Sequence, residues 1–101
     1  MAFVKVAQVS DLDASPLIEV LIDGNPYAVC RLNGEVHALD GVCPHQGGPL
    51  GQGMLTNTGI MCPWHAYEFD CRTGANDIEP DEKVRVYPVK IEGRDILVDV
   101  A

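Results

Sequence analysis

The chain has 101 residues, which is enough for one domain of ordinary size. Lysine and arginine number 7 against 15 aspartates and glutamates, and the formal charge is −8. This balance argues against nucleic acid, whose binding proteins carry a basic surface, and against an acidic lipid surface. A protein partner with a basic surface is more compatible with this negative charge. Because 47% of the residues are hydrophobic and 22% are charged, we expect the chain to fold.

The apolar runs of the chain are short. None approaches the ~20 residues that a membrane-spanning helix needs, and residues 1–15 hold no apolar stretch like that of a signal peptide. We therefore expect a cytoplasmic protein with no membrane partner. In such a compartment four cysteines indicate metal binding rather than disulfides. They are Cys30, Cys43, Cys62 and Cys71.

Short strand-prone runs alternate with turn residues along the whole chain. Asn33-Gly34 between two such runs predicts a hairpin. From 41 to 53 glycine and proline are so dense that no regular element is expected, and no helix is predicted anywhere. This pattern favours an all-β fold, a small sandwich or barrel. The predicted strands are 3–9, 17–22, 27–32, 36–39, 54–56, 60–61, 67–71, 84–91 and 96–100.

Two segments contain both cysteine and histidine. The first reads Cys43-Pro44-His45 and the second Cys62-Pro63-Trp64-His65, with 16 residues between the motifs. Each offers one thiolate and one imidazole from a tight loop. A Cys₂His₂ zinc site is one interpretation, because zinc accepts these ligands in tetrahedral geometry. Its usual spacing, however, groups the cysteines in one knuckle and the histidines on a helix, so mixed pairs on two loops favour a binuclear cluster.

The two motifs resemble the signature of the Rieske iron–sulfur proteins, C-x-H followed after a similar gap by C-x-x-H. The resemblance implies a Rieske-type β sandwich or barrel over 1–101, with a cluster-binding subdomain made of two loops, 43–50 and 62–70. It also implies one [2Fe–2S] cluster. Cys43 and Cys62 would bind one iron, and His45 and His65 would bind the other through Nδ1, which raises the potential above that of an all-cysteine cluster.

The flanking residues indicate a subtype within this resemblance. High-potential Rieske proteins carry an extra cysteine in each loop, and these form a disulfide; Gly48 and Trp64 occupy the matching positions here. Those proteins also use serine and tyrosine hydroxyls as donors to the sulfurs, where this chain has Tyr67 and Phe69. Phenylalanine cannot donate, so we expect a potential near the low end of the Rieske range, about −150 mV.

Other notable residues receive plainer interpretations. Cys30 is expected to be a buried apolar residue and Cys71 a packed thiol outside the ligand set. His37 is expected on a strand, facing solvent. Trp64 is expected to shield the cluster from water. The acidic stretch 77–82 is taken as a solvated loop, with docking to a basic partner as the alternative.

The resemblance implies a one-electron carrier rather than an enzyme. Only three histidines are present and two are assigned to the cluster, so the mononuclear iron site of a Rieske oxygenase cannot be built. A nucleotide- or flavin-binding fingerprint is also missing. We expect a monomeric ferredoxin that takes electrons from a flavin-dependent NAD(P)H reductase and passes them to a terminal oxygenase of the type that hydroxylates aromatic rings.

Two alternatives stay open at this point. Small Rieske subunits of NAD(P)H-dependent nitrite reductases have similar length and motifs, in which case the partner is the large subunit of that enzyme. A structural zinc module that mediates protein contacts is the second alternative. Metal content distinguishes the two, because a zinc module would contain zinc and a Rieske subunit would contain iron.

Overall fold

The computed structural model describes residues 3–44, 47–64, 67–76 and 82–100. Within these ranges the chain is mostly β, as the sequence predicts, and every pairing between strands is antiparallel. The strands are β1 (Phe3–Gln8), β2 (Leu17–Ile22), β3 (Asn25–Leu32), β4 (Glu35–Asp40), β5 (Met54–Leu55), β6 (Gly59–Met61), β7 (Glu68–Asp70), β8 (Val86–Tyr87), β9 (Val89–Glu92) and β10 (Asp95–Asp99).

The central sheet has the order β2-β3-β4-β8; its first three strands form two consecutive hairpins, and β8 pairs with β4. Asn33 and Gly34 join β3 to β4 with φ values of 53° and 81°, the paired positive φ of a type I′ turn. This confirms the hairpin expected from Asn-Gly. Asp23 and Gly24 form a second turn of the same kind, with φ values of 52° and 81°. The strand after it begins at Asn25, two residues earlier than predicted.

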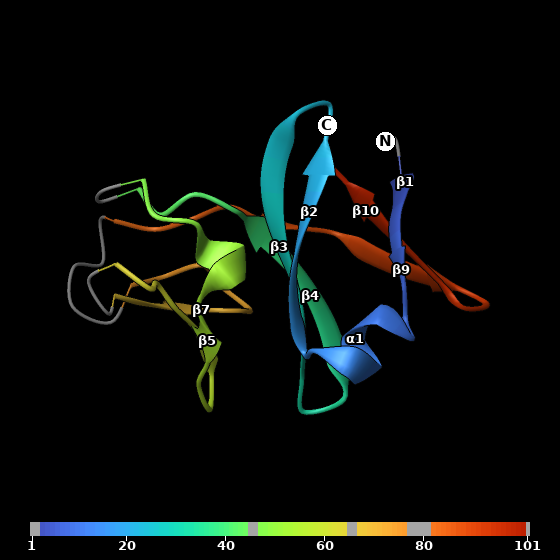
Figure 1. The fold of residues 1–101 in the computed structure, drawn as a ribbon, viewed down its shortest axis with the longest axis horizontal. Coiled ribbons are helices and arrows are strands. Elements are labelled where there is room, and N and C mark those ends of the chain that lie inside the picture. Colours follow the sequence, from blue (N-terminus) through green and yellow to red (C-terminus); the bar gives the residue numbers. More distant parts are fainter. Residues whose placement is uncertain (1–2, 45–46, 65–66, 77–81, 101) are drawn as a thin grey trace.

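The other two sheets pack on opposite faces of the central sheet (Figure 1). One has the order β1-β10-β9 and the other β5-β6-β7. Successive residues of β3 point to opposite faces, as the pleat requires. Ala28 and Cys30 belong to the core shared with the β5-β6-β7 side, whereas Val29 belongs to the core under β1 and β10. The β5-β6-β7 subdomain therefore packs on one face of the central sheet.

The predicted strand 84–91 is in fact two strands separated by Pro88. Proline cannot donate to a strand ladder. At this residue the chain leaves the central sheet, where β8 pairs with β4, and enters the outer sheet, where β9 pairs with β10. The interruption thus connects the two layers.

Two short helical segments depart from the expectation of no helix. The helix α1 (Asp11–Ala14) is a single turn that buries Leu12. The 3₁₀ helix η1 (Leu50–Gln52) lies in the stretch expected to be irregular and buries Leu50 completely. Apolar burial of one leucine in each turn stabilises a helical segment that is too short to be stable alone. Across the described ranges, no helix has the length and apolar character needed to cross a membrane.

Candidate metal centre

The first motif lies in a loop closed by its own backbone. The N–H of Cys43 donates to the carbonyl of Gly48, and the N–H of Gly47 donates back to the carbonyl of Cys43, both at 2.8 Å. Gly47 has a φ of 76°, a conformation that glycine adopts without strain. Val42 and Pro49 pair across the base of the loop. The sequence here forms a narrow hairpin that fixes the backbone of Cys43.

The second motif lies between β6 and β7. Cys62 follows β6 directly, and its N–H donates to the carbonyl of Tyr67 at 2.7 Å, which closes the loop just before β7. The register of the two strands, with Ile60 opposite Phe69, sets the position of this closure. Each motif cysteine is therefore held at the base of a loop by its own backbone amide.

The thiols of Cys43 and Cys62 are buried, with exposed fractions of 0% and 1%. Both belong to the core cluster of the subdomain, which includes the fully buried side chains of Leu50, Ile60 and Phe69. Two cysteines from separate loops in one buried cluster suit the two-cysteine half of an iron–sulfur site, because thiolate is the ligand that such clusters use. His45 and His65 lie outside the described residues; in the sequence each falls inside one of the closed loops.

The two loops touch each other through Gly48. A Cβ added at Gly48 would lie 2.7 Å from Sγ of Cys62 and 3.1 Å from Cγ of Trp64. The two positions that match the extra cysteines of high-potential Rieske proteins therefore face each other here, as glycine and tryptophan. Trp64 remains 60% exposed, so the indole lies at the protein surface while its ring carbons lie against the first loop.

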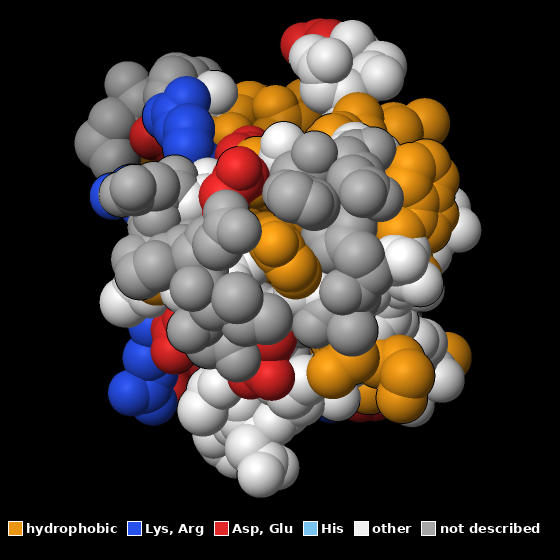
Figure 2. Space-filling view, turned by 90° about the vertical axis from the view of Figure 1, so that its left-hand side faces the viewer, with side chains coloured by type: hydrophobic (Ala, Val, Ile, Leu, Met, Phe, Trp, Pro, Cys, Tyr) orange, Lys and Arg blue, Asp and Glu red, His pale blue; other side chains and the backbone are white. Residues whose placement is uncertain are grey.

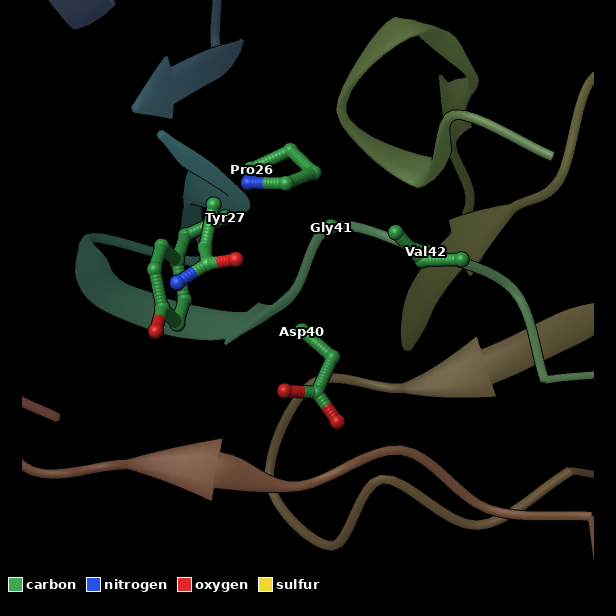
Figure 3. Close-up of a pocket in the computed structure, with 6 residues that line it drawn as sticks. Pro26, Tyr27, Asp40, Gly41 and Val42 are labelled. Carbon is green, nitrogen blue, oxygen red and sulfur yellow. The ribbon is translucent and has the colours of Figure 1, made fainter. Parts of the chain in front are cut away.

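The first loop is also anchored to the central sheet. A Cβ on Gly41 would lie 2.5 Å from the carbonyl carbon of Pro26, and the N–H of Gly41 donates to the carbonyl of Pro26 at 3.1 Å. Beside this contact is a hollow of about 280 Å³, lined by Asn25, Pro26, Tyr27, Asp40, Gly41 and Val42. Figure 3 shows Pro26 and Gly41 near each other at its edge. The hollow lies where the loop leaves β4, and among the described residues its lining includes neither Cys43 nor Cys62.

Asp40, at the end of β4, connects this anchor to β8. Its carboxylate accepts hydrogen bonds from the hydroxyl of Tyr87 and from the backbone N–H of Arg85. Burial raises the pKa of Tyr87, and the hydrogen bond to Asp40 raises it further because the phenolate would face a carboxylate. The segment entering the first loop is thereby tied to the last strand of the central sheet.

The structure places the remaining singled-out residues as follows. Cys30 and Cys71 are buried, as expected, but their sulfurs lie only 3.3 Å apart, a contact that reading each cysteine separately missed. His37 is half-buried on β4 rather than freely facing solvent. Of the acidic stretch 77–82, only Glu82 falls within the described residues, and it is half-buried.

Comparison with known families gives a match to the Rieske [2Fe-2S] domain over residues 2–88. The chain is 34% identical over 101 residues to the biphenyl dioxygenase ferredoxin subunit of Pseudomonas sp. strain KKS102, covering 98% of this chain and 93% of that protein. The resemblance therefore extends along both proteins almost completely.

Solved structures agree with this match. The ferredoxin of carbazole 1,9a-dioxygenase from Nocardioides aromaticivorans IC177 superposes with a TM-score of 0.86 at 32% identity and 97% coverage of both chains. A ferredoxin solved in complex with the oxygenase of carbazole 1,9a-dioxygenase gives 0.84 at 28% identity, covering 95% of this chain and 91% of that one.

A third solved structure belongs to another enzyme system. It is described as a putative small subunit of NADH-dependent nitrite reductase from Mycobacterium tuberculosis, with a TM-score of 0.87, 26% identity and coverage of 99% and 96%. The family match carries with it one [2Fe–2S] cluster per domain. The chain thus belongs to the Rieske [2Fe–2S] family and is homologous to the ferredoxin components of aromatic dioxygenase systems.

Proposed function

We propose that this protein is a one-electron carrier between a flavin-dependent NAD(P)H reductase and the terminal oxygenase of an aromatic-ring dioxygenase system. The observation that carries the proposal is the pairing of two backbone-closed loops that bury Cys43 and Cys62 in one core, in a chain with the length of a dioxygenase ferredoxin. The proposal includes the expected cytoplasmic location and a single Rieske domain over 1–101.

The ligand assignment is part of this proposal. Cys43 and Cys62 would bind one iron as thiolates, and His45 and His65 would bind the other. When bound, the [2Fe–2S] cluster supplies a site that gains and loses one electron. The buried core around the two cysteines excludes water on the protein side, which tunes the potential of that site. One-electron transfer through such a cluster needs no separate substrate pocket, which fits an electron carrier.

Contact with redox partners is proposed at the end of the molecule that carries the two loops. Trp64 in the second loop is 60% exposed and Val42 at the base of the first is 45% exposed, so both offer apolar area there. Figure 2 looks onto this side, where hydrophobic and acidic side chains are visible around the undescribed residues and basic side chains lie toward one edge. With a net charge of −8, the chain would meet a basic partner surface in a weak, salt-sensitive encounter.

The experiment is reconstitution of electron transfer. The protein is added as sole mediator between a flavin-dependent reductase and an aromatic-ring dioxygenase oxygenase, and the hydroxylated product is measured. We expect product only when the protein is present, a rate that falls as ionic strength rises, and no product with Cys43→Ser. Reduction by the reductase without transfer to any oxygenase would contradict the proposed acceptor. A rate independent of salt would contradict the proposed role of the negative charge in partner binding.

A second candidate function follows from the match to the nitrite reductase small subunit, which covers nearly all of both chains. In that case the partner would be the large subunit of an NAD(P)H-dependent nitrite reductase. Stable co-purification with that subunit, in place of a transient encounter with an oxygenase, would favour this second function.

A further inference from the structure

Two cysteines outside the ligand motifs meet in the core of the subdomain. Cys30 comes from β3 and Cys71 from the residue after β7, 41 positions later in the chain. Their Sγ atoms are 3.3 Å apart, and both side chains have an exposed fraction of 0%. Neither cysteine belongs to the proposed cluster ligands, so the electron-carrier function does not explain them.

The pair joins the two halves of the molecule. Cys30 lies on the face of the central sheet that supports the β5-β6-β7 subdomain, and Cys71 belongs to that subdomain. The backbone N–H of Cys71 donates to the carbonyl of Thr58, so its place beside β6 is fixed. The segment between the two cysteines contains both ligand loops. A bond between these sulfurs would therefore tie the loop-bearing part of the chain to its supporting sheet.

The chemistry of the pair suits oxidation. A disulfide has an S–S distance of about 2.0 Å, so the sulfurs need to approach by little more than one ångström from their present contact. The hydrogen bond from the Cys30 thiol lowers the pKa of Cys71, and the same bond together with burial raises the pKa of Cys30. Cys71 is thus the better nucleophile of the two, because thiolate is the reactive form.

A surface hollow lies beside the pair. It has a volume of about 160 Å³ and is lined by Leu32, Asn33, Asn57, Thr58, Asp70 and Arg72. Asp70 and Arg72 flank Cys71 in sequence, and Leu32 lies two residues beyond Cys30 on β3. Residues that adjoin both cysteines in sequence thus line one surface hollow, whereas the two cysteines are themselves buried.

We propose that Cys30 and Cys71 form a reversible disulfide when the protein meets a peroxide. The Cys71 thiolate attacks one oxygen of hydrogen peroxide, which breaks the O–O bond and gives a sulfenic acid and hydroxide. The sulfur of Cys30 then attacks Sγ of Cys71 and displaces the second oxygen as hydroxide. The two thiol protons convert the two hydroxides to water, so two thiols and one peroxide give one disulfide and two waters.

The cross-link joins two cysteines that are 41 positions apart, and the segment between them contains both ligand loops. A bond across so long a loop restricts the unfolded chain and opposes separation of the subdomain from the central sheet. We therefore infer that the oxidised protein holds its cluster to a higher temperature than the reduced protein. A dithiol reductant reverses the effect by thiol–disulfide exchange.

The experiment uses the cluster-loaded protein and one equivalent of hydrogen peroxide. The sample is unfolded in denaturant at neutral pH with a chelator and a maleimide, so that every remaining thiol is alkylated, and is then digested with trypsin and Glu-C. Cleavage after Glu68 and Arg72 separates Cys71 from both motif cysteines. Cleavage after Glu19 and Arg31 isolates Cys30. Mass spectrometry then identifies which peptides are joined.

We expect a Cys30–Cys71 cross-linked peptide, alkylation of the other two cysteines, and return to four alkylated cysteines after dithiothreitol. The temperature at which the visible absorption of the cluster is lost should rise on oxidation and fall back on reduction. Cys71→Ser should show neither effect. Four alkylated cysteines after peroxide, a cross-link that includes Cys43 or Cys62, or an isolated sulfinic acid at Cys71 would each overturn the proposal, and the mapping on the unmodified chain does not depend on the variant folding.

Discussion

The α-carbon of Gly48 faces the sulfur of Cys62 so closely that a Cβ there would lie only 2.7 Å from Sγ. The two loops come from different parts of the chain, so this contact sets their spacing. Trp64 borders the same point, with Cγ 3.1 Å from the added Cβ. Glycine is required here for close approach and not for a positive φ. A side chain at position 48 of this protein would require the Cys62 sulfur or the loop backbone to move.

Replacement of Gly48 by alanine should therefore disturb the site. We expect Gly48→Ala to lose most of its bound iron, because the new methyl group must displace either the Cys62 sulfur or the loop backbone. The measurement is iron per chain together with the visible spectrum. Gly93→Ala is the matched control: Gly93 has a φ of 62° but nothing within 4 Å of an added Cβ, so it should cost about 1 kcal/mol of stability and leave the iron content unchanged. Equal iron content in the two variants would refute the steric argument.

A hydroxyl at position 69 should raise the potential. Phe69 is fully buried and occupies the position where high-potential relatives place a donor tyrosine. A hydrogen bond to a charged group is worth about 1.5–3 kcal/mol. For one electron this corresponds to at most roughly 65–130 mV, at about 2.3 kcal/mol per 100 mV. We expect Phe69→Tyr to shift the midpoint upward within that limit, measured by a spectroscopic redox titration.

Phe69→Leu is the packing control for that prediction. It changes the buried shape without adding a donor, so the potential should stay near the starting value of about −150 mV. An upward shift of the same size in both variants would mean that packing, and not the hydrogen bond, sets the potential. A starting potential above about +100 mV would contradict the low-potential assignment itself.

Exchange of one histidine ligand for cysteine should act in the opposite direction. Two ferric ions, two sulfides and two thiolates sum to zero charge, and a third thiolate makes the oxidised cluster negative. We expect His45→Cys or His65→Cys to lower the midpoint potential or to lose the cluster. His37→Gln, which removes an imidazole from β4, should change neither property. An intact His65→Cys protein with an unchanged potential would refute the ligand assignment.

The Tyr87–Asp40 hydrogen bond should give a distinct alkaline dependence of stability. The pKa of Tyr87 is raised in the folded state, so its contribution is fully present below the unfolded pKa of about 10 and is lost as pH rises through the folded value. Tyr87→Phe should cost about 1.5 kcal/mol at neutral pH and flatten the loss of stability above about pH 10. Denaturant unfolding at neutral pH and above about pH 10 measures the free energy of unfolding of each variant, with Tyr27→Phe as the control. The same alkaline slope with and without the Tyr87 hydroxyl would contradict it.

Local signals in the sequence were enough to predict most of the scaffold. The strand at 17–22 has the predicted bounds, and Asn33-Gly34 produces the expected hairpin, because turn chemistry and β propensity act over a few residues. The motif cysteines were singled out by their spacing together with the resemblance to the Rieske signature. The structure buries both in one core and closes each loop by its backbone, and their assignment as ligands stays a prediction.

Features that depend on distant residues could not be predicted in the same way. Leu12 and Leu50 induce short helical turns only because the core accepts their side chains. The Cys30–Cys71 contact joins residues 41 positions apart, and neither has a motif around it. The predicted strand 84–91 contains Pro88, and the change of sheet at that residue follows from the pairing of β8 with β4 and of β9 with β10. In each case tertiary packing decides the outcome.

Nitrogen hyperfine coupling in the pulsed EPR spectrum of the dithionite-reduced protein tests whether two histidines and two cysteines hold the cluster. We expect a paramagnetic [2Fe–2S] cluster, about one per chain, whose unpaired electron couples to two imidazole nitrogens. Those couplings should disappear one at a time in His45→Cys and His65→Cys variants that retain a cluster. A reduced cluster without nitrogen coupling, or a colourless protein that contains zinc and gives no signal, would contradict a cluster held by Cys43, His45, Cys62 and His65.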